Sequence, residues 1–308
     1  MHDLIIIGAG PAGLTAGLYA GRFRLNAVIL EKINPGGQII FSPTIENYPG
    51  FPGEMSTHEL IDRFEKQVEG AGVQIKIEEV TGIEPGPDLK PPVYKLKTNL
   101  GAYKTRSLII ATGAQPKRLE VEGEKKFLGR GVSYCGTCDG PMFKGKHVLV
   151  VGAGDRAIEE AIFLSRYARQ VTVVHRRKQL RASKILEEKL KQEPKICFKL
   201  DTVIEKIEGS VKVESAKLKN VVTGKEEAFA CDGVFIFIGI VPNTGFVKNL
   251  LQVDEAGFII TDQDLKTSAA GVFACGDCCQ KGLYQVVNAC GEGAVAADSA
   301  HKYLLLQK

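Results

Sequence analysis

The sequence Leu4-Ile5-Ile6-Ile7-Gly8-Ala9-Gly10-Pro11-Ala12-Gly13 decides the fold, because it runs from an apolar strand through a glycine-rich turn into a helix. The apolar run predicts a buried strand over residues 4–7, and the pattern that follows predicts a helix over residues 14–22. In this G-x-G-x-x-G motif the first glycine makes the tight turn, the second lets the backbone approach a pyrophosphate, and the third lets the helix pack against the strand. The stretch therefore predicts a dinucleotide-binding unit. The alternative is a glycine-rich helix start that holds no ligand.

An acid follows the motif where dinucleotide sites use one. A second apolar strand, residues 27–30, ends at Glu31, whose carboxylate can accept both hydroxyls of an adenosine ribose. Strand, turn, helix, strand and acid occur in register, which favours a bound dinucleotide over the ligand-free alternative. The predicted contacts from the turn are Gly8, Gly10, Pro11, Ala12 and Gly13.

A second copy of the motif, Gly152-Ala153-Gly154-Asp155-Arg156-Ala157, lies between an apolar strand at residues 146–151 and a predicted helix at residues 158–167. Ala157 takes the packing role of the third glycine. The next strand, residues 171–174, ends at His175-Arg176-Arg177, and Arg181 follows. Cations at this place suit the 2′-phosphate of NADP, where a site for NAD would hold an acid. The alternative for the basic cluster is a solvated turn. The contacts predicted here are Gly152, Gly154, Asp155, Ala157, His175, Arg176, Arg177 and Arg181.

Between the two motifs lies Cys135-Gly136-Thr137-Cys138-Asp139-Gly140, a C-x-x-C pair followed by an acid. This spacing suits a reversible disulfide, in which one sulfur meets a partner and the other lies underneath. The alternative is half of a zinc site completed by the second C-x-x-C pair, Cys275 and Cys278. The two pairs are about 140 residues apart, far beyond zinc-ribbon spacing, which favours the redox interpretation.

The other segments suggest that the chain begins and ends in one domain. Residues 34–53 form a Gly- and Pro-rich loop typical of binding, and a helix is expected at residues 57–69. Segments 73–77, 93–96 and 105–110 predict a small antiparallel sheet, and the last of them runs into Ala111-Thr112-Gly113. Near the end, a strand at residues 271–275 leads into Gly276-Asp277 and a helix at residues 289–306. The predicted fold class is α/β, with two dinucleotide-binding, Rossmann-like, three-layer ββα domains: residues 1–114 and 245–308 form the first, and residues 115–244 form the inserted second.

Composition excludes several classes of protein. The 308 residues are 44% hydrophobic and 25% charged, as in ordinary globular proteins, and the net charge of +4 is too small for a nucleic-acid-binding surface. No apolar run is long enough for a membrane span, and no signal-peptide pattern precedes the first strand. We therefore expect a cytosolic protein with no nucleic-acid or membrane partner. Its eight cysteines are expected to be free thiols plus one catalytic pair, with no metal.

Taken together, the motifs resemble those of the low-molecular-weight thioredoxin reductases over nearly the whole chain. The matching stretches occur in order: GAGPAG at 8–13, GGQ at 36–38, ENYPGFP at 46–52, ATG at 111–113, CGTCDG at 135–140, GAGDRAIEEA at 152–161, HRR at 175–177 with Arg181, GIVPNT at 239–244, GD at 276–277 and a tail from Gln285 to Ala297. The resemblance implies FAD in the first domain, NADPH in the second, a thioredoxin-like protein disulfide as substrate, and a homodimer. The FAD contacts that it adds are Gly37, Gln38, Asn47, Thr112, Gly113, Gly276, Asp277 and Gln285.

The resemblance also implies the catalytic roles. Hydride passes from the nicotinamide to the flavin, Cys138 faces the flavin, Cys135 attacks the protein substrate, and Asp139 carries a proton. Because both reactions need one flavin, family members rotate the two domains about hinges, here expected near residues 114–117 and 241–246.

Two departures bear on the electron donor. Tyr284 stands where the family usually has an arginine, and Arg156 stands where the second motif usually has a small residue. A ferredoxin-dependent flavin thioredoxin reductase is therefore one alternative function, although the retained basic cluster favours NADPH. A nucleotide- or zinc-binding module without enzymatic activity is the other. For Cys278, Cys279 and Cys290, the alternatives are inert buried thiols, which we favour, and a second redox relay.

Overall fold

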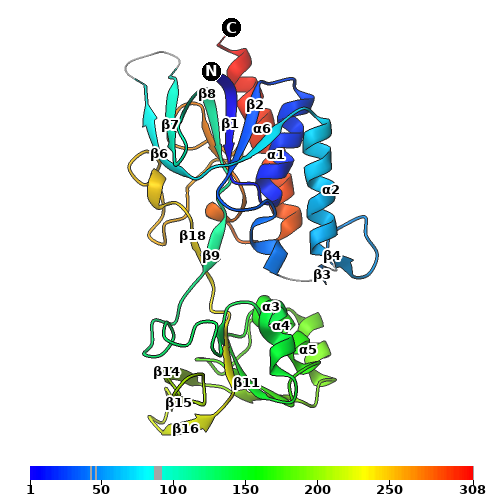
Figure 1. Ribbon diagram of the computed structural model, residues 1–308, viewed down its shortest axis with the longest axis vertical. Coiled ribbons are helices and arrows are strands. Elements are labelled where there is room, and N and C mark those ends of the chain that lie inside the picture. Colours follow the sequence, from blue (N-terminus) through cyan, green and yellow to red (C-terminus); the bar gives the residue numbers. More distant parts are fainter. Residues whose placement is uncertain (42–43, 46, 87–91, 308) are drawn as a thin grey trace. The chain divides into compact units, whose positions relative to one another are not determined.

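The computed structural model describes residues 1–41, 44–45, 47–86 and 92–307, except for the side chains of Phe41, Thr137 and Cys138 (Figure 1). The chain forms two compact units. Unit 1 consists of Met1–Gln115 and Val241–Lys308, and unit 2 consists of Pro116–Ile240. The short strands β9 (Ala114–Pro116) and β18 (Ile240–Pro242), where the chain passes from one unit to the other, pair with each other.

Unit 1 is built on a largely parallel sheet. Strands β5 (Gln74–Ile77), β2 (Ala27–Glu31), β1 (His2–Ile7) and β8 (Ala102–Ile110) lie in that order, and β19 (Val272–Ala274) pairs with the end of β8. All of these pairings are parallel. The last strand from the C-terminal segment thus completes a sheet that the first strand of the chain begins.

The predicted antiparallel sheet is partly wrong. Strands β6 (Val80–Pro85) and β7 (Tyr94–Thr98) are antiparallel, as is the pairing of β7 with the first half of β8. However, β5 pairs parallel to β2, and the second half of β8 pairs parallel to β1. Short alternating segments carry the same pattern in either kind of sheet, so the pattern alone did not reveal their partners.

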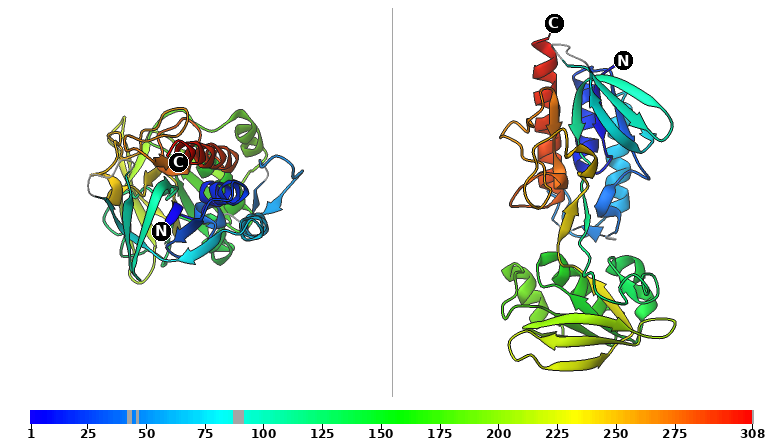
Figure 2. Two further views of the ribbon diagram at one scale, coloured as in Figure 1. Left: turned by 90° about the horizontal axis from the view of Figure 1, so that it is seen from above. Right: turned by 90° about the vertical axis from the view of Figure 1, so that its left-hand side faces the viewer.

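Three helices of unit 1 are α1 (Pro11–Arg22), α2 (Thr57–Gly70) and α6 (Val286–Leu305). Successive residues of β1 point to opposite faces of the sheet: Leu4 and Ile6 join the core with α1 and α6, whereas Ile5 and Ile7 join the core with β7. α1 and α6 run side by side (Figures 1 and 2). A Cβ on Gly293 would lie 2.2 Å from the carbonyl oxygen of Ala12, so this close approach requires a glycine.

The shorter elements of unit 1 are η1 (Gly37–Phe41), β3 (Thr44–Ile45), β4 (Met55–Ser56), η3 (Gly245–Val247) and η4 (Gly276–Cys278). Strands β3 and β4 form an antiparallel pair, after which the Ser56 hydroxyl accepts a hydrogen bond from the Glu59 N–H and caps α2. Within the described residues, no helix of either unit is long and apolar enough to cross a membrane.

Unit 2 repeats the parallel architecture. Its sheet has the order β10 (Val132–Ser133), β17 (Gly233–Ile236), β11 (His147–Val151), β12 (Gln170–Val174) and β13 (Ile196–Lys199). Helices α4 (Asp155–Ser165) and α5 (Lys184–Lys191) pack on one face, and the antiparallel strands β14 (Thr202–Glu208), β15 (Ser215–Asn220) and β16 (Glu226–Ala230) contribute to the core on the other. The predicted α/β fold class is confirmed.

Candidate active site

The predicted contacts of the first dinucleotide loop meet at one edge of the sheet in unit 1. Gly8 follows β1, Glu31 ends β2, Thr112 follows β8, and Asp277 follows β19. Because these strands are parallel and adjacent, their carboxyl ends lie together, and this edge is where α/β sheets bind nucleotides. The sheet thus collects residues from both ends of the chain at one edge.

Backbone geometry requires glycine at two positions of this loop, Gly8 and Gly13. Gly8 has a φ of +105°, and a Cβ there would lie 2.4 Å from the carbonyl oxygen of Ala111. A Cβ on Gly13 would lie 1.9 Å from the carbonyl oxygen of Gly8. The loop therefore folds tightly onto α1, and the first turn of that helix, which begins at Pro11, has free backbone N–H groups for a pyrophosphate.

Backbone N–H groups of the neighbouring loops hold the Glu31 carboxylate in place. One carboxylate oxygen accepts the Ala9 N–H at 2.7 Å, and the other accepts the Ile33 N–H at 3.0 Å. A carboxylate oxygen can accept two hydrogen bonds, so each keeps capacity for a ribose hydroxyl. This geometry fits the predicted role of Glu31.

The loop after β2 adds polar groups to the same edge. The Gly36 N–H donates to the carbonyl oxygen of Ala9 at 2.8 Å, which ties the two loops together. Gln38 then places its amide oxygen in a buried position where, among the described residues, it has no hydrogen-bond partner. A buried acceptor without a donor is costly, and a flavin edge could supply the missing donor. The residues present therefore fit a bound flavin.

Two further predicted contacts, Asn47 and Gln285, pair directly. The Asn47 amide donates to the Gln285 side-chain oxygen at 3.0 Å, which joins the loop after β3 to the start of α6. Glu46, the first residue of the ENYPGFP stretch, lies outside the described residues. The ring centroids of Tyr284 and Phe258 lie 5.7 Å apart. Burial raises the pKa of the Tyr284 hydroxyl.

The Gly-Asp turn after β19 depends on an acid that the sequence did not reveal. Glu292 of α6 accepts the Gly276 N–H at 2.7 Å, and it forms an ion pair with Lys281 that is largely shielded from solvent. Its other oxygen accepts the Asn288 amide at 3.0 Å. Glu292 thus holds the turn that carries Asp277. The sequence signal for this ion pair was the presence of two opposite charges, Lys281 and Glu292, in a segment rich in small residues.

The C-terminal thiols lie in the interior of unit 1. Cys275 and Cys278 are fully buried and free, and burial raises the pKa of Cys275 well above its usual value. Cys290 is buried and free as well. Within the described part of the chain, no three His, Cys, Asp or Glu side chains are arranged to hold a metal ion.

The second dinucleotide loop repeats the geometry of the first. Gly152 has a φ of +125°, and a Cβ there would lie 2.1 Å from the carbonyl oxygen of Phe237 and 3.2 Å from the Cβ of Ala157. A Cβ on Gly154 would meet nothing within 4 Å, so the N-terminus of α4 is open to a phosphate. Asp155 accepts the Ser183 N–H at 2.6 Å, which fixes the loop after β12 to this helix start.

The predicted basic cluster gathers beside that loop. The Arg181 N–H donates to the carbonyl oxygen of Ala153 at 2.7 Å, while Arg176, Arg177 and Arg181 expose their side chains. His175 is buried, and among the described residues its Nε2 has no partner. Burial and the neighbouring arginines lower the pKa of His175. The cluster could hold a doubly charged phosphate.

Arg156 does not close this opening. Its guanidinium lies 5.7 Å from the centre of the Phe237 ring, a cation–π arrangement. The space beside Gly154 is empty to 4 Å. The Arg156 side chain therefore leaves the space beside Gly154 open.

The redox segment packs on α4. It comprises α3 (Gly136–Asp139) and η2 (Gly140–Phe143), and Cys135 takes part in a disulfide. The Ser133 hydroxyl braces Cys135 by accepting its N–H and donating to its carbonyl oxygen, each at 3.0 Å. The side chain of Cys138 lies outside the described part of the structure, so its predicted position facing a flavin stays a prediction, as does the proton-carrying role of Asp139.

Two buried acids that the sequence did not reveal lie next to this segment. Glu124 is 2% exposed and accepts the Tyr134 hydroxyl at 2.5 Å and the N–H groups of Leu119 and Glu120 at 2.9 and 2.6 Å. Glu160 of α4 is 4% exposed and lies against Gly136. The available signal for Glu160 was a charge on the apolar face of an amphipathic helix.

Comparisons with known proteins agree with this geometry. The model of the pyridine nucleotide-disulphide oxidoreductase family matches residues 2–293. The thioredoxin reductase of Treponema pallidum (strain Nichols) is 44% identical over 303 residues, which cover 98% of this chain and 97% of that protein. The crystal structure of Lactococcus lactis thioredoxin reductase superposes with a TM-score of 0.95 at 42% identity, covering 99% of this chain and 100% of that one. That of T. acidophilum gives 0.91 at 34% identity, covering 98% of each.

These matches extend over nearly the whole length of each chain, and the structure adds two dinucleotide-type loops and a disulfide in the C-x-x-C segment. The chain therefore belongs to the pyridine nucleotide-disulphide oxidoreductase family and, within it, to the thioredoxin reductases, which are flavoprotein oxidoreductases.

Proposed function

We propose that the chain is an NADPH-dependent thioredoxin-disulfide reductase that binds FAD in unit 1 and NADPH in unit 2 and works through a Cys135–Cys138 disulfide. The observation that carries the proposal is the disulfide at Cys135, in a segment packed against the helix that opens the second dinucleotide loop. When bound, the two cofactors supply hydride acceptance and two-electron delivery to a disulfide. The chain supplies the binding groups and the thiols.

In unit 1, the binding groups proposed for FAD are those at the carboxyl-end edge of the sheet. The Gly8–Gly13 loop would hold the pyrophosphate, Glu31 the adenosine ribose, and the buried Gln38 oxygen a donor on the flavin. Asp277, on the turn that Glu292 braces, would accept ribityl hydroxyls.

In unit 2, the open start of α4 would hold the NADPH pyrophosphate, and the exposed arginines after β12 would hold its 2′-phosphate. Within the described part of the chain, no ion pair occupies Arg176, Arg177 or Arg181. A binding role for these side chains is therefore favoured over a solvated turn. These retained cations support NADPH rather than ferredoxin as the donor.

The thiols perform the exchange with the protein substrate. Cys135 would attack the disulfide of a thioredoxin, and Cys138 would resolve the mixed disulfide, so that two electrons pass to thioredoxin and the S–S bond of the enzyme re-forms. Asp139 would give a proton to the departing thiolate. We place this chemistry in the cytosol, because the six other cysteines are free thiols, as a reducing compartment maintains.

Replacement of Cys138 tests the proposal. Cys138→Ser should retain its flavin absorption and its reduction by NADPH but lose thioredoxin-dependent NADPH oxidation. Cys197→Ser is the matched control, because Cys197 is an exposed free thiol in the same unit. Thioredoxin turnover by Cys138→Ser at the wild-type rate, or a purified protein without flavin absorption, would refute the proposed function.

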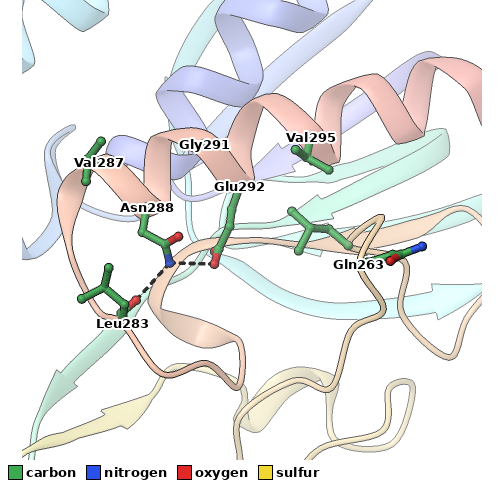
Figure 3. A pocket seen from close by; sticks show the side chains of 8 residues that line it. Gln263, Leu283, Val287, Asn288, Gly291, Glu292 and Val295 are labelled. Carbon is green, nitrogen blue, oxygen red and sulfur yellow. Dashed lines mark hydrogen bonds between the residues drawn. The ribbon is translucent and has the colours of Figure 1, made fainter. Parts of the chain in front are cut away.

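We also propose that the chain forms a homodimer through an apolar face of α6. A cavity of about 430 Å³ opens on this face (Figure 3), lined by Gln263, Leu265, Leu283, Val287, Asn288, Gly291, Glu292 and Val295. Val287, Gly291 and Val295 are four residues apart and so share one side of the helix. Leu283 is 55% exposed, and Val287 and Val295 are each 41% exposed.

The dimer proposal is tested by the mass of the particle in solution. Val287→Asp should convert a dimer to a monomer, because a charge would be buried in an apolar contact. Val222→Asp is the control, because Val222 is 75% exposed in the other unit. A wild-type monomer, or a Val287→Asp dimer of unchanged stability, would overturn the proposal.

A further inference from the structure

Glu160 is a buried carboxyl that the proposed electron path leaves unused. It lies on the inner side of α4, and a Cβ placed on Gly136 would be 2.1 Å from its Oε2. Gly136 is the residue after Cys135, so the carboxyl lies directly against the backbone of the C-x-x-C pair. Both residues belong to unit 2, so their contact does not depend on how the units are arranged.

The surroundings of this carboxyl are poor in compensating groups. Ala157, Ala161 and Leu164, on the same side of α4, are buried in the apolar core. Oε2 is buried, and among the described residues it makes no hydrogen bond of normal geometry. A buried carboxylate in this position is destabilised, and a bound proton removes most of that cost.

The charges that act on Glu160 are few. Burial raises its pKa to about 7, against a smaller lowering by Arg156 and by the backbone of Gly136, while the neighbouring Glu159 raises it further. Gly136, which this carboxyl contacts, follows Cys135 directly, and the other residues of the redox segment that can change charge are Cys138 and Asp139, two and three positions further on. The carboxyl is thus poised to respond to a new negative charge at the redox segment.

We propose that Glu160 shares a proton with the reduced Cys135–Cys138 pair, holding it when one sulfur is a thiolate and releasing it when the disulfide re-forms. This inference rests on the proposed function. On reduction the S–S bond breaks, two electrons enter from the reductant, and two protons follow. One proton binds a sulfur, and the second lies on the other sulfur or on Glu160, because two adjacent negative charges repel each other. On oxidation the two electrons pass to the substrate disulfide and both protons leave.

Glu160 is therefore a positioning residue: it holds a proton against the backbone at Gly136, next to the redox pair. Its charge opposes thiolate formation, so that removing the charge should make the reduced pair more acidic. Glutamine keeps the shape of the side chain and cannot ionise, which makes Glu160→Gln the informative change. Glu188→Gln is the matched control, because Glu188 is an exposed acid on the neighbouring helix α5.

The test measures the pH profile of alkylation of the reduced holoenzyme. Each protein is reduced with dithiothreitol, desalted without oxygen and treated with iodoacetamide from pH 5 to pH 9, and the modified Cys135 and Cys138 peptides are quantified by mass spectrometry. We expect the midpoint of thiolate reactivity to move down by about one pH value in Glu160→Gln. Alkylation should be up to about tenfold faster than in the wild type from about pH 7 upwards, where the wild-type carboxyl is ionised, and equal at pH 5, where that carboxyl is protonated. Glu160→Asp, which retains a carboxyl, and Glu188→Gln should keep the wild-type profile.

Identical profiles in the wild type and Glu160→Gln, or a midpoint that moves up, would overturn the inference. A pair that never forms a reversible disulfide would instead overturn the proposed function. If Glu160→Gln does not fold, redox-difference infrared spectra of the wild type and Glu160→Asp decide: a protonated-carboxyl band gained on reduction, at different frequencies in the two proteins, supports the inference. No such band, or an identical band in both proteins, contradicts it.

Discussion

Removing Arg176 and Arg181 together should damage the use of NADPH far more than the use of NADH. Both side chains are exposed beside the open start of α4, and the backbone of Arg181 is fixed to Ala153 by a 2.7 Å hydrogen bond. A hydrogen bond to a charged group contributes about 1.5–3 kcal/mol, so two contacts with the 2′-phosphate amount to about 3–6 kcal/mol. Because exposed charges are screened by solvent and salt, we take the lower end. The apparent KM for NADPH should then rise about 100-fold in Arg176→Ala/Arg181→Ala.

The assay follows flavin reduction and steady-state turnover with each nucleotide at two salt concentrations. NADH lacks the 2′-phosphate, so its KM should change by less than about threefold, and the NADPH effect should shrink as salt rises. Lys212→Ala is a suitable control, since it removes an exposed cation elsewhere in the same unit. Equal losses with both nucleotides would refute a role in 2′-phosphate binding, and an unchanged KM for NADPH would remove these arginines from the site altogether.

Three further predictions concern stability and flavin retention. The pKa of Glu160 rises from an ordinary 4.5 to about 7 on folding, so its contribution to stability is present below pH 4.5 and is lost as the pH rises to 7. Above pH 7 the free energy of unfolding of Glu160→Gln, measured in urea, should therefore exceed that of the wild type by up to about 3 kcal/mol. A difference that is constant with pH would contradict this. Glu292→Gln should weaken FAD retention about tenfold during dialysis, because the turn after β19 loses a charged acceptor, and unchanged retention would show that the turn holds itself. Gly293→Val should cost more than about 4 kcal/mol or prevent folding, because its Cβ would lie 2.2 Å from the Ala12 carbonyl oxygen. Gly70→Ala in α2, where a Cβ would meet nothing within 4 Å, should gain about 0.5–1 kcal/mol. Similar unfolding midpoints for the two variants would refute the packing argument.

Local sequence predicted the dinucleotide loops well because the backbone there allows few residues. Gly8 has a positive φ and no room for a side chain, so only glycine fits there, and the residue type itself predicts the turn. The strand partners of residues 74–77 were not predicted, because a four-residue segment has the same pattern in a parallel or an antiparallel pairing. Long-range pairing of this kind is decided by the packing of the whole sheet.

The site residues divide along the same line. Residues within motifs, such as Glu31, were predicted from their spacing. Glu160 and Glu292 contact backbone far away in the sequence, whereas Glu124 is a buried acid that accepts hydrogen bonds from residues nearby in the sequence. Glutamate is usually solvated, and the sequence signals that accompany Glu160 and Glu292 are too weak to single these residues out. Burial and hydrogen bonding distinguish them, and both properties follow from tertiary structure.

Helix α4 connects two parts of the proposed chemistry. Its N-terminus, at Gly154 and Asp155, is the open end of the second dinucleotide loop, and Glu160 lies less than two turns further along, against the redox segment. Arg156, between them, lies over the Phe237 ring and also lowers the pKa of Glu160. A phosphate bound at the helix start would attract this guanidinium and so weaken its hold on the Glu160 charge. Nucleotide binding should therefore raise the affinity of Glu160 for a proton, and by reciprocity protonation of Glu160 should strengthen nucleotide binding. Arg156→Ser removes the connecting charge. It should therefore abolish the pH dependence of nucleotide affinity that comes from Glu160, while leaving the disulfide in place.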